Sequence, residues 1–278
     1  MKKKTEARRV REIGFLGAGN MAGALVKGLL ATKRRRARDL WASDAEPRQV
    51  AKLVRAHGIG RASDNATLVR DSAVVVLAVK PQVMSAVLAE IRPHVTRRHL
   101  VVSIAAGMGT SRLEAELGGR VRVVRAMPNT PALVGEGMTV VVRGAHATAA
   151  DERRAANLFG GVGAVVRVRD EGLMDAITGL SGSGPAYVYR FAEGLIAGAV
   201  AEGLSDAVAR QLTYQTLRGA AVMLQETGRP PEELRAMVSS PGGTTLAGLG
   251  ALDERGFVDA ASAAVAAAAR RGRELGRG

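Results

Sequence analysis

Residues 11–22 of the chain read Arg-Glu-Ile-Gly-Phe-Leu-Gly-Ala-Gly-Asn-Met-Ala. An apolar-rich, strand-like segment precedes Gly17, and a helix-forming segment follows Gly19. Gly17, Gly19 and Ala22 fit the G-x-G-x-x-G/A fingerprint of dinucleotide-binding folds. In that fingerprint the first glycine permits a tight turn, the second lets the backbone approach a pyrophosphate, and the small third residue allows close helix–strand packing. The stretch therefore predicts a Rossmann-type unit, with a plain strand-to-helix turn as the alternative.

Strand-like and helix-like segments alternate from this point up to about residue 169. Such alternation predicts an α/β domain with a parallel, doubly wound sheet, which we assign to residues 11–169. The strands are expected at Arg11–Leu16, Leu40–Ser43, Val74–Val79, Leu100–Ile104, Val121–Arg125, Met138–Val142 and Ala164–Val168. The helices are expected at Met21–Thr32, Pro47–His57, Pro81–Ile91 and Ser111–Leu117.

The pattern becomes helical after about Asp170, so we expect an all-helical C-terminal domain over residues 170–278. Its alanine-rich tail, Ala260–Ala269, is too apolar for an isolated surface helix and should pack on another helix, within the chain or across a subunit interface. Residues 1–10 are expected to form a disordered basic arm. The helices are expected at Leu173–Thr178, Pro185–Gly203, Asp206–Thr227, Pro231–Val238 and Phe257–Arg273.

Composition excludes several classes of protein. The chain has no cysteine, which rules out disulfides, thiolate zinc sites and cysteine nucleophiles. Its 4 histidines have no metal-ligand spacing, so no metal is expected. No apolar run reaches the ~18 residues that span a bilayer, and no signal peptide is evident. We therefore expect a cytoplasmic protein with no membrane partner.

The formal net charge is +14, which raises the question of nucleic-acid binding. Much of the excess lies in short basic runs, including the N-terminal arm and residues 33–38. Aromatic residues make up only 3%, and no nucleic-acid motif is recognised. We expect no nucleic-acid partner; an arginine-rich surface that attracts a negatively charged cofactor and substrate is the simpler explanation.

Candidate cofactor residues follow the carboxyl ends of the predicted strands, where open α/β sheets bind ligands. Asp44 follows the second strand, where a carboxylate accepts the ribose hydroxyls of NAD, although it equally fits a turn or helix-cap acid. With Ser43 and Arg48 nearby, the choice between NADPH and NADH stays open. The amide of Asn129 could serve a nicotinamide carboxamide or fix its own turn. The expected cofactor-binding set is Gly17, Ala18, Gly19, Asn20, Met21, Ser43, Asp44, Asn65, Ala78, Val79, Lys80, Pro81, Ala105, Ala106, Gly107 and Asn129.

A second candidate site lies near the C-terminus, where residues 239–246 read Ser-Ser-Pro-Gly-Gly-Thr-Thr-Leu. Two glycines after a proline suit a tight turn, and the hydroxyls open a helix-like run. Such a turn can direct backbone N–H groups and a threonine side chain at a small anion, or it can simply cap a helix.

These motifs together resemble those of the pyrroline-5-carboxylate reductases, the enzymes of the last reduction in proline biosynthesis. The resemblance runs in order over almost the whole chain, from about Ile13 to Leu275. The matching pieces are Gly-Ala-Gly-Asn-Met-Ala (17–22), Ala-Val-Lys-Pro-Gln (78–82), Arg-Ala-Met-Pro-Asn-Thr-Pro-Ala (125–132), Asp-Ala-Ile-Thr-Gly-Leu-Ser-Gly-Ser-Gly-Pro-Ala-Tyr (175–187) and Ser-Pro-Gly-Gly-Thr-Thr (240–245).

The resemblance implies hydride transfer from NADPH or NADH to the C=N carbon of 1-pyrroline-5-carboxylate, giving proline. It implies that Thr245 faces the ring nitrogen as the catalytic hydroxyl, that Gly243 and Thr244 help to hold the substrate carboxylate, and that Ser240 and Glu171 lie close to the substrate. It also implies that the helical domain is a dimerisation domain and that dimers gather into larger rings.

Two other functions are compatible with the glycine fingerprint. A 3-hydroxyacid dehydrogenase of similar two-domain build would use a lysine on the helix after Pro185, and residues 186–190 contain none. A non-catalytic, NADP-sensing protein would keep the glycine fingerprint but would not need residues 240–245. Both count as weaker than the reductase.

Overall fold

The structure is a computed structural model and describes residues 11–277. The expected disordered arm, residues 1–10, lies outside the described residues. The chain divides into two compact units. The first runs to Gly182 and takes in the end of the chain from Ala268, and the second is Ser183–Ala267. The domain limits drawn above, 11–169 and 170–278, rest on the change from alternating strand and helix segments to a helical pattern, and they stay a prediction.

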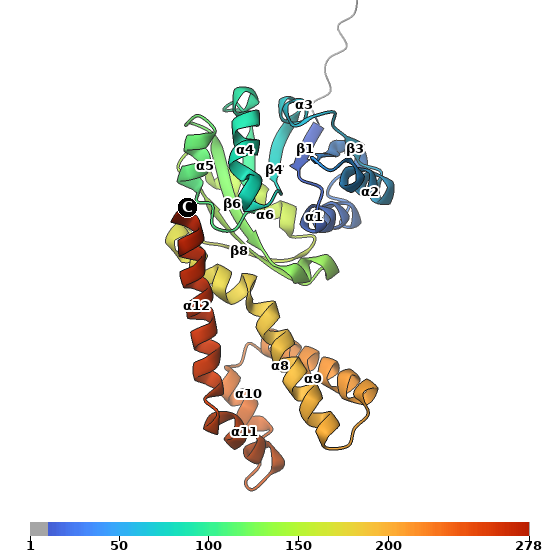
Figure 1. Ribbon diagram of the computed structural model, residues 1–278, viewed down its shortest axis with the longest axis vertical. Helices are drawn as coiled ribbons and strands as arrows, with labels where there is room; N and C mark the ends of the chain where they lie inside the picture. The colour runs from blue at the N-terminus through green and yellow to red at the C-terminus, as the bar shows by residue number, and fades with distance from the viewer. Residues whose placement is uncertain (1–10, 278) are drawn as a thin grey trace, which may run out of the picture. The chain divides into compact units, whose positions relative to one another are not determined.

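The first unit is built on an eight-stranded sheet of order β3-β2-β1-β4-β5-β6-β7-β8 (Figure 1). Every neighbouring pair is parallel except β6 and β7. The α/β, doubly wound prediction is thus confirmed. Strands β1 and β2 have the predicted limits, the limits of β4 to β8 are shifted by up to three residues, and β3 was not predicted. The strands are β1 (Arg11–Leu16), β2 (Leu40–Ser43), β3 (Gly60–Arg61), β4 (Ser72–Leu77), β5 (Leu100–Ser103), β6 (Arg122–Pro128), β7 (Gly137–Arg143) and β8 (Gly163–Arg167).

The antiparallel β6–β7 pair departs from the all-parallel expectation. The link from Pro128 to Gly137 contains one short 3₁₀ helix, η3 (Thr130–Val134), and then Gly135 at φ +86°. A parallel crossover needs a dozen or more residues, so a link this short can only reverse the chain. Strand β8 is parallel to β7 because the helix α6 (Ala149–Phe159) supplies a full crossover.

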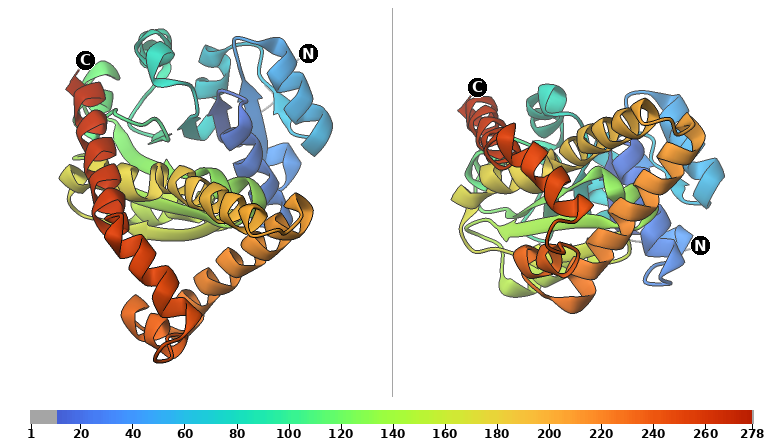
Figure 2. Two further views of the ribbon diagram at one scale, coloured as in Figure 1. Left: turned by 60° about the horizontal axis from the view of Figure 1, so that its bottom comes forward. Right: turned by 90° about the horizontal axis from the view of Figure 1, so that it is seen from below.

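The second unit is helical, as predicted. In it α8 and α9 contact each other, and they diverge from the short turn that joins them (Figure 2). The ring centroids of Phe191 and Phe257 are 5.3 Å apart, and the Tyr187 hydroxyl donates to the carbonyl of Ala264 at 3.3 Å. Its helices are α8 (Gly184–Ala201), α9 (Asp206–Thr227), α10 (Pro231–Met237), α11 (Thr244–Glu254) and the first part of α12 (Phe257–Arg277). None of the helices in residues 11–277 is long and apolar enough to cross a membrane.

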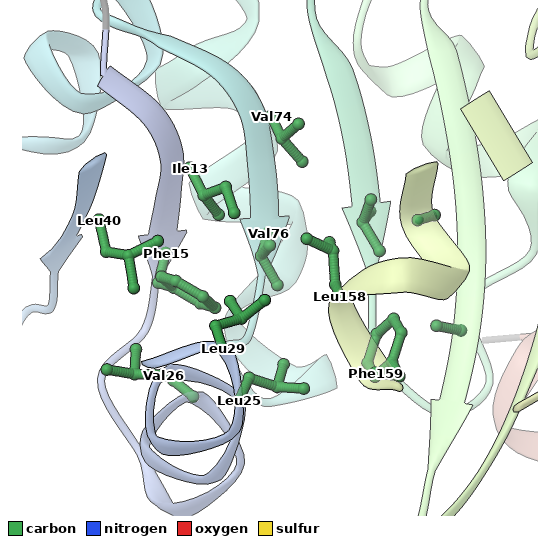
Figure 3. Close-up of a cluster of buried hydrophobic side chains, with 14 of the residues drawn as sticks. Ile13, Phe15, Leu25, Val26, Leu29, Leu40, Val74, Val76, Leu158 and Phe159 are labelled. Carbon is green, nitrogen blue, oxygen red and sulfur yellow. The ribbon is translucent and has the colours of Figure 1, made fainter. Parts of the chain in front are cut away.

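Helices cover both faces of the sheet in the first unit (Figure 1). Successive side chains of a strand point to opposite faces, so the apolar strands supply a core on each side. Val74 and Val76 of β4 join the core with Ile13, Phe15 and Leu25 (Figure 3), whereas Val75 and Leu77 join the core on the other face. The helices of this unit are α1 (Asn20–Ala31), α2 (Pro47–His57), α3 (Asn65–Arg70), α4 (Pro81–Ile91), α5 (Thr110–Glu116), α6 and α7 (Met174–Ile177). Short 3₁₀ helices lie at η1 (Ala37–Asp39), η2 (Arg92–His94), η3 and η4 (Glu171–Leu173), and a π-helical turn, η5, at Thr178–Gly182.

Candidate functional site

The glycine loop between β1 and α1 is built as the fingerprint predicts. Gly17 has φ +100°, and a Cβ there would stand 2.6 Å from the carbonyl oxygen of Ala78. The Gly17 N–H donates to Ser43 O at 2.8 Å, and the Ala78 N–H donates to Leu16 O at 2.7 Å. Only glycine fits at position 17, and the loop is fastened to the carboxyl ends of three neighbouring strands.

Gly19 is the N-cap of α1, and its surroundings differ from those of Gly17. A Cβ added there would have no heavy atom within 4 Å. As a glycine N-cap it has no side chain to accept from the first-turn N–H groups of α1. The open space and these amides are what a pyrophosphate needs at a helix N-terminus, so the loop fits a dinucleotide.

A cleft of about 370 Å³ lies beside this loop and gathers eight of the predicted cofactor residues. Asn20 and Ala18 line a neighbouring cavity of about 240 Å³ instead. Glu46 and Gln49, which the sequence analysis did not select, also line the cleft. The eight predicted residues are Gly17, Gly19, Ser43, Asp44, Asn65, Ala78, Val79 and Lys80. Met21, Pro81, Ala105, Ala106, Gly107 and Asn129 do not line it.

Asp44 performs a structural task at the rim of this cleft. Its Oδ2 accepts from the Ala18 N–H at 2.7 Å, and its Oδ1 accepts from the Glu46 N–H at 2.8 Å. The carboxylate therefore fastens the glycine loop to the turn after β2, and it still lines the cleft. Ser43 donates its hydroxyl to Asn65 Oδ1 at 2.8 Å, and Asn65 Nδ2 donates to Glu90 at 2.7 Å.

Asn129 fixes the turn after β6. Its Nδ2 donates to the carbonyl of Ser181 at 3.1 Å, and its Oδ1 accepts from the Met138 N–H at 2.9 Å. The side-chain amide thus ties the Met-Pro-Asn-Thr-Pro stretch to the π-helical turn Thr178–Gly182 and to β7.

Glu171 lies in a network that the sequence analysis did not foresee. Its Oε1 accepts from the Thr110 N–H at 2.8 Å and from Arg125 Nη1 at 3.2 Å. The Thr110 hydroxyl donates to its Oε2. These residues are 46 and 61 positions apart from Glu171, so no local spacing signals the contact.

The turn at residues 240–245 belongs to the second unit, where it opens α11. The Gly243 N–H donates to Ser240 O at 3.0 Å, and Gly242 has φ +67°. A Cβ on Gly243 would stand 2.5 Å from the Ser240 hydroxyl oxygen, so a larger residue would displace that side chain. Gly243 is the N-cap, and it offers no side-chain acceptor to the N–H groups of Thr244 and Thr245.

Residues 11–277 contain no cluster of three or more His, Asp or Glu side chains suited to a metal ion.

Comparisons with known proteins connect the two parts of the chain. Residues 12–107 match the family described as "NADP oxidoreductase coenzyme F420-dependent", and residues 171–275 match "Pyrroline-5-carboxylate reductase dimerisation". The chain is 43% identical over 267 residues to a pyrroline-5-carboxylate reductase of Methanosarcina acetivorans, covering 96% of this chain and 98% of that one. It is 41% identical to pyrroline-5-carboxylate reductase 3 of Rattus norvegicus, covering 96% and 97%.

Solved structures agree with the sequence matches. A pyrroline-5-carboxylate reductase from Coxiella burnetii superposes with a TM-score of 0.89 at 35% identity, covering 96% of this chain and 98% of that one. The Plasmodium falciparum pyrroline carboxylate reductase, solved with NADP bound, gives 0.86 at 31% identity, covering 97% and 100%. The 3-hydroxyacid dehydrogenase and NADP-sensing alternatives are not favoured by these matches. The chain belongs to the pyrroline-5-carboxylate reductase family.

Proposed function

We propose that this chain reduces 1-pyrroline-5-carboxylate to L-proline with NADPH or NADH as the reductant. The observation that carries the proposal is the identity of about 40% to pyrroline-5-carboxylate reductases along almost the entire chain. The glycine loop and the cleft beside it support the cofactor half of the proposal, and the glycine-capped start of α11 supports the acid-substrate half.

The residues that would hold the cofactor are those of the glycine loop and the adjacent strand ends. Gly19 and the first-turn amides of α1 suit the pyrophosphate, and Asp44, Asn65 and Lys80 line the cleft for the adenosine side. Met21, Pro81, Ala105, Ala106, Gly107 and Asn129 complete the proposed set. When bound, the reduced nicotinamide supplies a hydride to the C=N carbon of the substrate.

The substrate would be held by the turn at the start of α11. The backbone N–H groups of Thr244 and Thr245 can bind its carboxylate, since a helix N-terminus favours an anion. The Gly243 N–H closes the turn on Ser240 O, and Gly243 brings the backbone close to the substrate. The Thr245 hydroxyl can donate to the ring nitrogen and pass on the proton that this nitrogen gains during reduction. Ser240, beside Gly243, adds a hydroxyl. Glu171 is proposed to lie close to the substrate, with Thr110 and Arg125 fixing its carboxylate.

Replacing the Thr245 hydroxyl tests this assignment. A general-acid contribution is worth about 10²–10⁴-fold in rate, so Thr245→Ala should lower kcat by at least about 100-fold. Thr245→Ser keeps a hydroxyl and should keep most of the rate. The measurement is NAD(P)H oxidation by absorbance, with pyrroline-5-carboxylate as substrate. A Thr245→Ala enzyme with wild-type kcat would refute the proposed role of the hydroxyl.

The helical unit carries the dimerisation domain of the family, so the chain forms a homodimer. We further propose that the dimers gather into a larger ring. The resemblance to the family and the many exposed apolar side chains of the helical unit support this.

A cytoplasmic location is also proposed, on the ground that the reaction needs a pool of reduced nicotinamide cofactor. Cell fractionation with an antibody to the chain would test it.

A further inference from the structure

A buried arginine, Arg125, lies on β6 and pairs with Glu171. Arg125 is only 5% exposed, and its Nη1 donates to Glu171. Its Nε and Nη2 are buried without a hydrogen-bond partner in the described part of the chain. A guanidinium stays charged in proteins, and a buried charge is costly unless it is paired. Glu171 is therefore the carboxylate on which the burial of Arg125 depends.

Glu171 in turn connects three segments that are far apart in the sequence. It belongs to η4, it pairs with β6 through Arg125, and it accepts two hydrogen bonds from Thr110, one from the backbone and one from the hydroxyl. Thr110 is itself 6% exposed and is the first residue of α5. The Glu171 side chain is half-buried, and hydrogen bonds to an ionised carboxylate are stronger than those between neutral groups.

Thr110 ends the loop that joins β5 to α5. The other end is held by the Ile104 N–H, which donates to Leu77 O at 3.1 Å. Between these two points lie Ala105, Ala106 and Gly107, the last with φ +73°. A dinucleotide fold has two mononucleotide-binding halves, and the cleft at β1 and β2 belongs to the adenosine half. The loop after β5 belongs to the other half, which takes the nicotinamide.

We propose that Thr110 and Arg125 are positioning residues, which act through Glu171 to hold the 104–109 loop in the conformation that binds the nicotinamide half of the cofactor. The inference rests on the proposed function only for the identity of the dinucleotide. It predicts an effect confined to one half of the cofactor, because the glycine loop and Asp44 have their own hydrogen bonds.

The test compares Thr110→Val, which keeps the shape but loses the hydroxyl, with Thr110→Ser, which keeps the hydroxyl. Titration calorimetry on the full-length protein measures the Kd of NADPH, NADH, ADP-ribose and 2′-phospho-ADP-ribose for each variant. Thr110→Val should raise the Kd of both complete dinucleotides by about tenfold and change the Kd of the two fragments less than about twofold. Thr110→Ser should restore dinucleotide binding to within about threefold of the wild type.

Glu171→Gln is the second variant, in case Thr110→Val folds poorly, because it keeps the volume and removes the charge that pairs with Arg125. The same split between dinucleotides and fragments is expected. An equal weakening of dinucleotides and fragments would mean general destabilisation and overturn the proposal, as would unchanged dinucleotide binding. No substrate is present in these titrations, so a failure of the reductase assignment in turnover assays would be seen separately.

Discussion

At the scale of single residues, the two glycines of the fingerprint have different reasons to be glycine. Gly17 has a positive φ and a carbonyl oxygen 2.6 Å from where its Cβ would lie, whereas Gly19 has neither constraint. The fold therefore requires the first glycine, and only an approaching ligand requires the second. The sequence motif alone assigns both glycines to cofactor binding, whereas the structure shows that Gly17 is required by the backbone conformation and Gly19 is not.

The two substitutions should consequently have opposite signatures. Gly19→Ala should lower the Tm only slightly, through the poorer N-cap, and raise the Kd of NADPH and NADH by at least about tenfold, because the new Cβ extends into the space for the pyrophosphate. Gly17→Ala should lower the free energy of unfolding by at least about 1 kcal/mol, because an L-residue resists that φ. Thermal melts and titration calorimetry measure the two effects. A Gly19→Ala protein that binds both cofactors normally would contradict the loop assignment.

His99 is a buried histidine whose pKa is lowered from its usual value, first by burial and then by the positive charge of Arg98. The Thr96 N–H donates to its Nδ1 at 2.8 Å, which requires that nitrogen to be unprotonated. The unfolded chain therefore binds a proton here more readily than the native protein does. The stability that neutral His99 contributes is fully present above its pKa in the unfolded chain, about 6.5. It is lost as pH falls from there toward the lower pKa of His99 in the native protein.

Urea denaturation between pH 7.5 and pH 5 checks this expectation. The wild type should lose stability over that interval, and His99→Asn, which keeps an acceptor near the Thr96 amide and cannot titrate there, should lose less. Equal pH dependence in both proteins would show that His99 contributes nothing to it.

At the scale of elements, the sequence predicts those whose signal is local. Strand β1 and helices α2, α4 and α9 have the expected limits, because Pro47 and Pro81 mark helix starts and Gly58 and Gly228 end helices in a left-handed conformation. Helix α6 was missed although its capping box, Thr148 with Asp151, stands in the sequence.

Elements and contacts that depend on residues far away in the sequence could not be predicted from local sequence patterns. Strand β3 has two residues and exists through its pairing with β2. The antiparallel β7 follows from a link too short for a crossover, a signal that periodicity does not carry. The Glu171 network joins residues whose sequence neighbours give no sign of it, whereas the eight predicted residues that line the cleft beside the glycine loop follow from strand ends.

At the scale of the whole molecule, the helical unit exposes more large apolar side chains than a monomer usually does. Val258 is 67% exposed, Tyr189 59% and Leu212 54%. Burial of such side chains against a second copy is what a dimerisation domain requires.

A charge placed in this apolar surface should therefore weaken the dimer. Leu212→Glu is expected to raise the dimer dissociation constant by at least about 100-fold, since it leaves a charge in an apolar contact. Gln211→Glu, next to it on the same helix, adds the same charge at a polar position and serves as the control. Light scattering after size exclusion reports the mass, and for the wild type it also distinguishes a dimer from a ring. A Leu212→Glu protein that keeps the wild-type mass would exclude α9 from the interface.

The function proposed for the whole chain is the reduction of 1-pyrroline-5-carboxylate. The most direct measurement incubates the wild-type protein with this substrate and NADPH or NADH, following the absorbance of the cofactor and quantifying proline. One L-proline should form for each NAD(P)H oxidised, with at least one of the two cofactors. No substrate-dependent oxidation with either cofactor, in a protein that binds them, would contradict it.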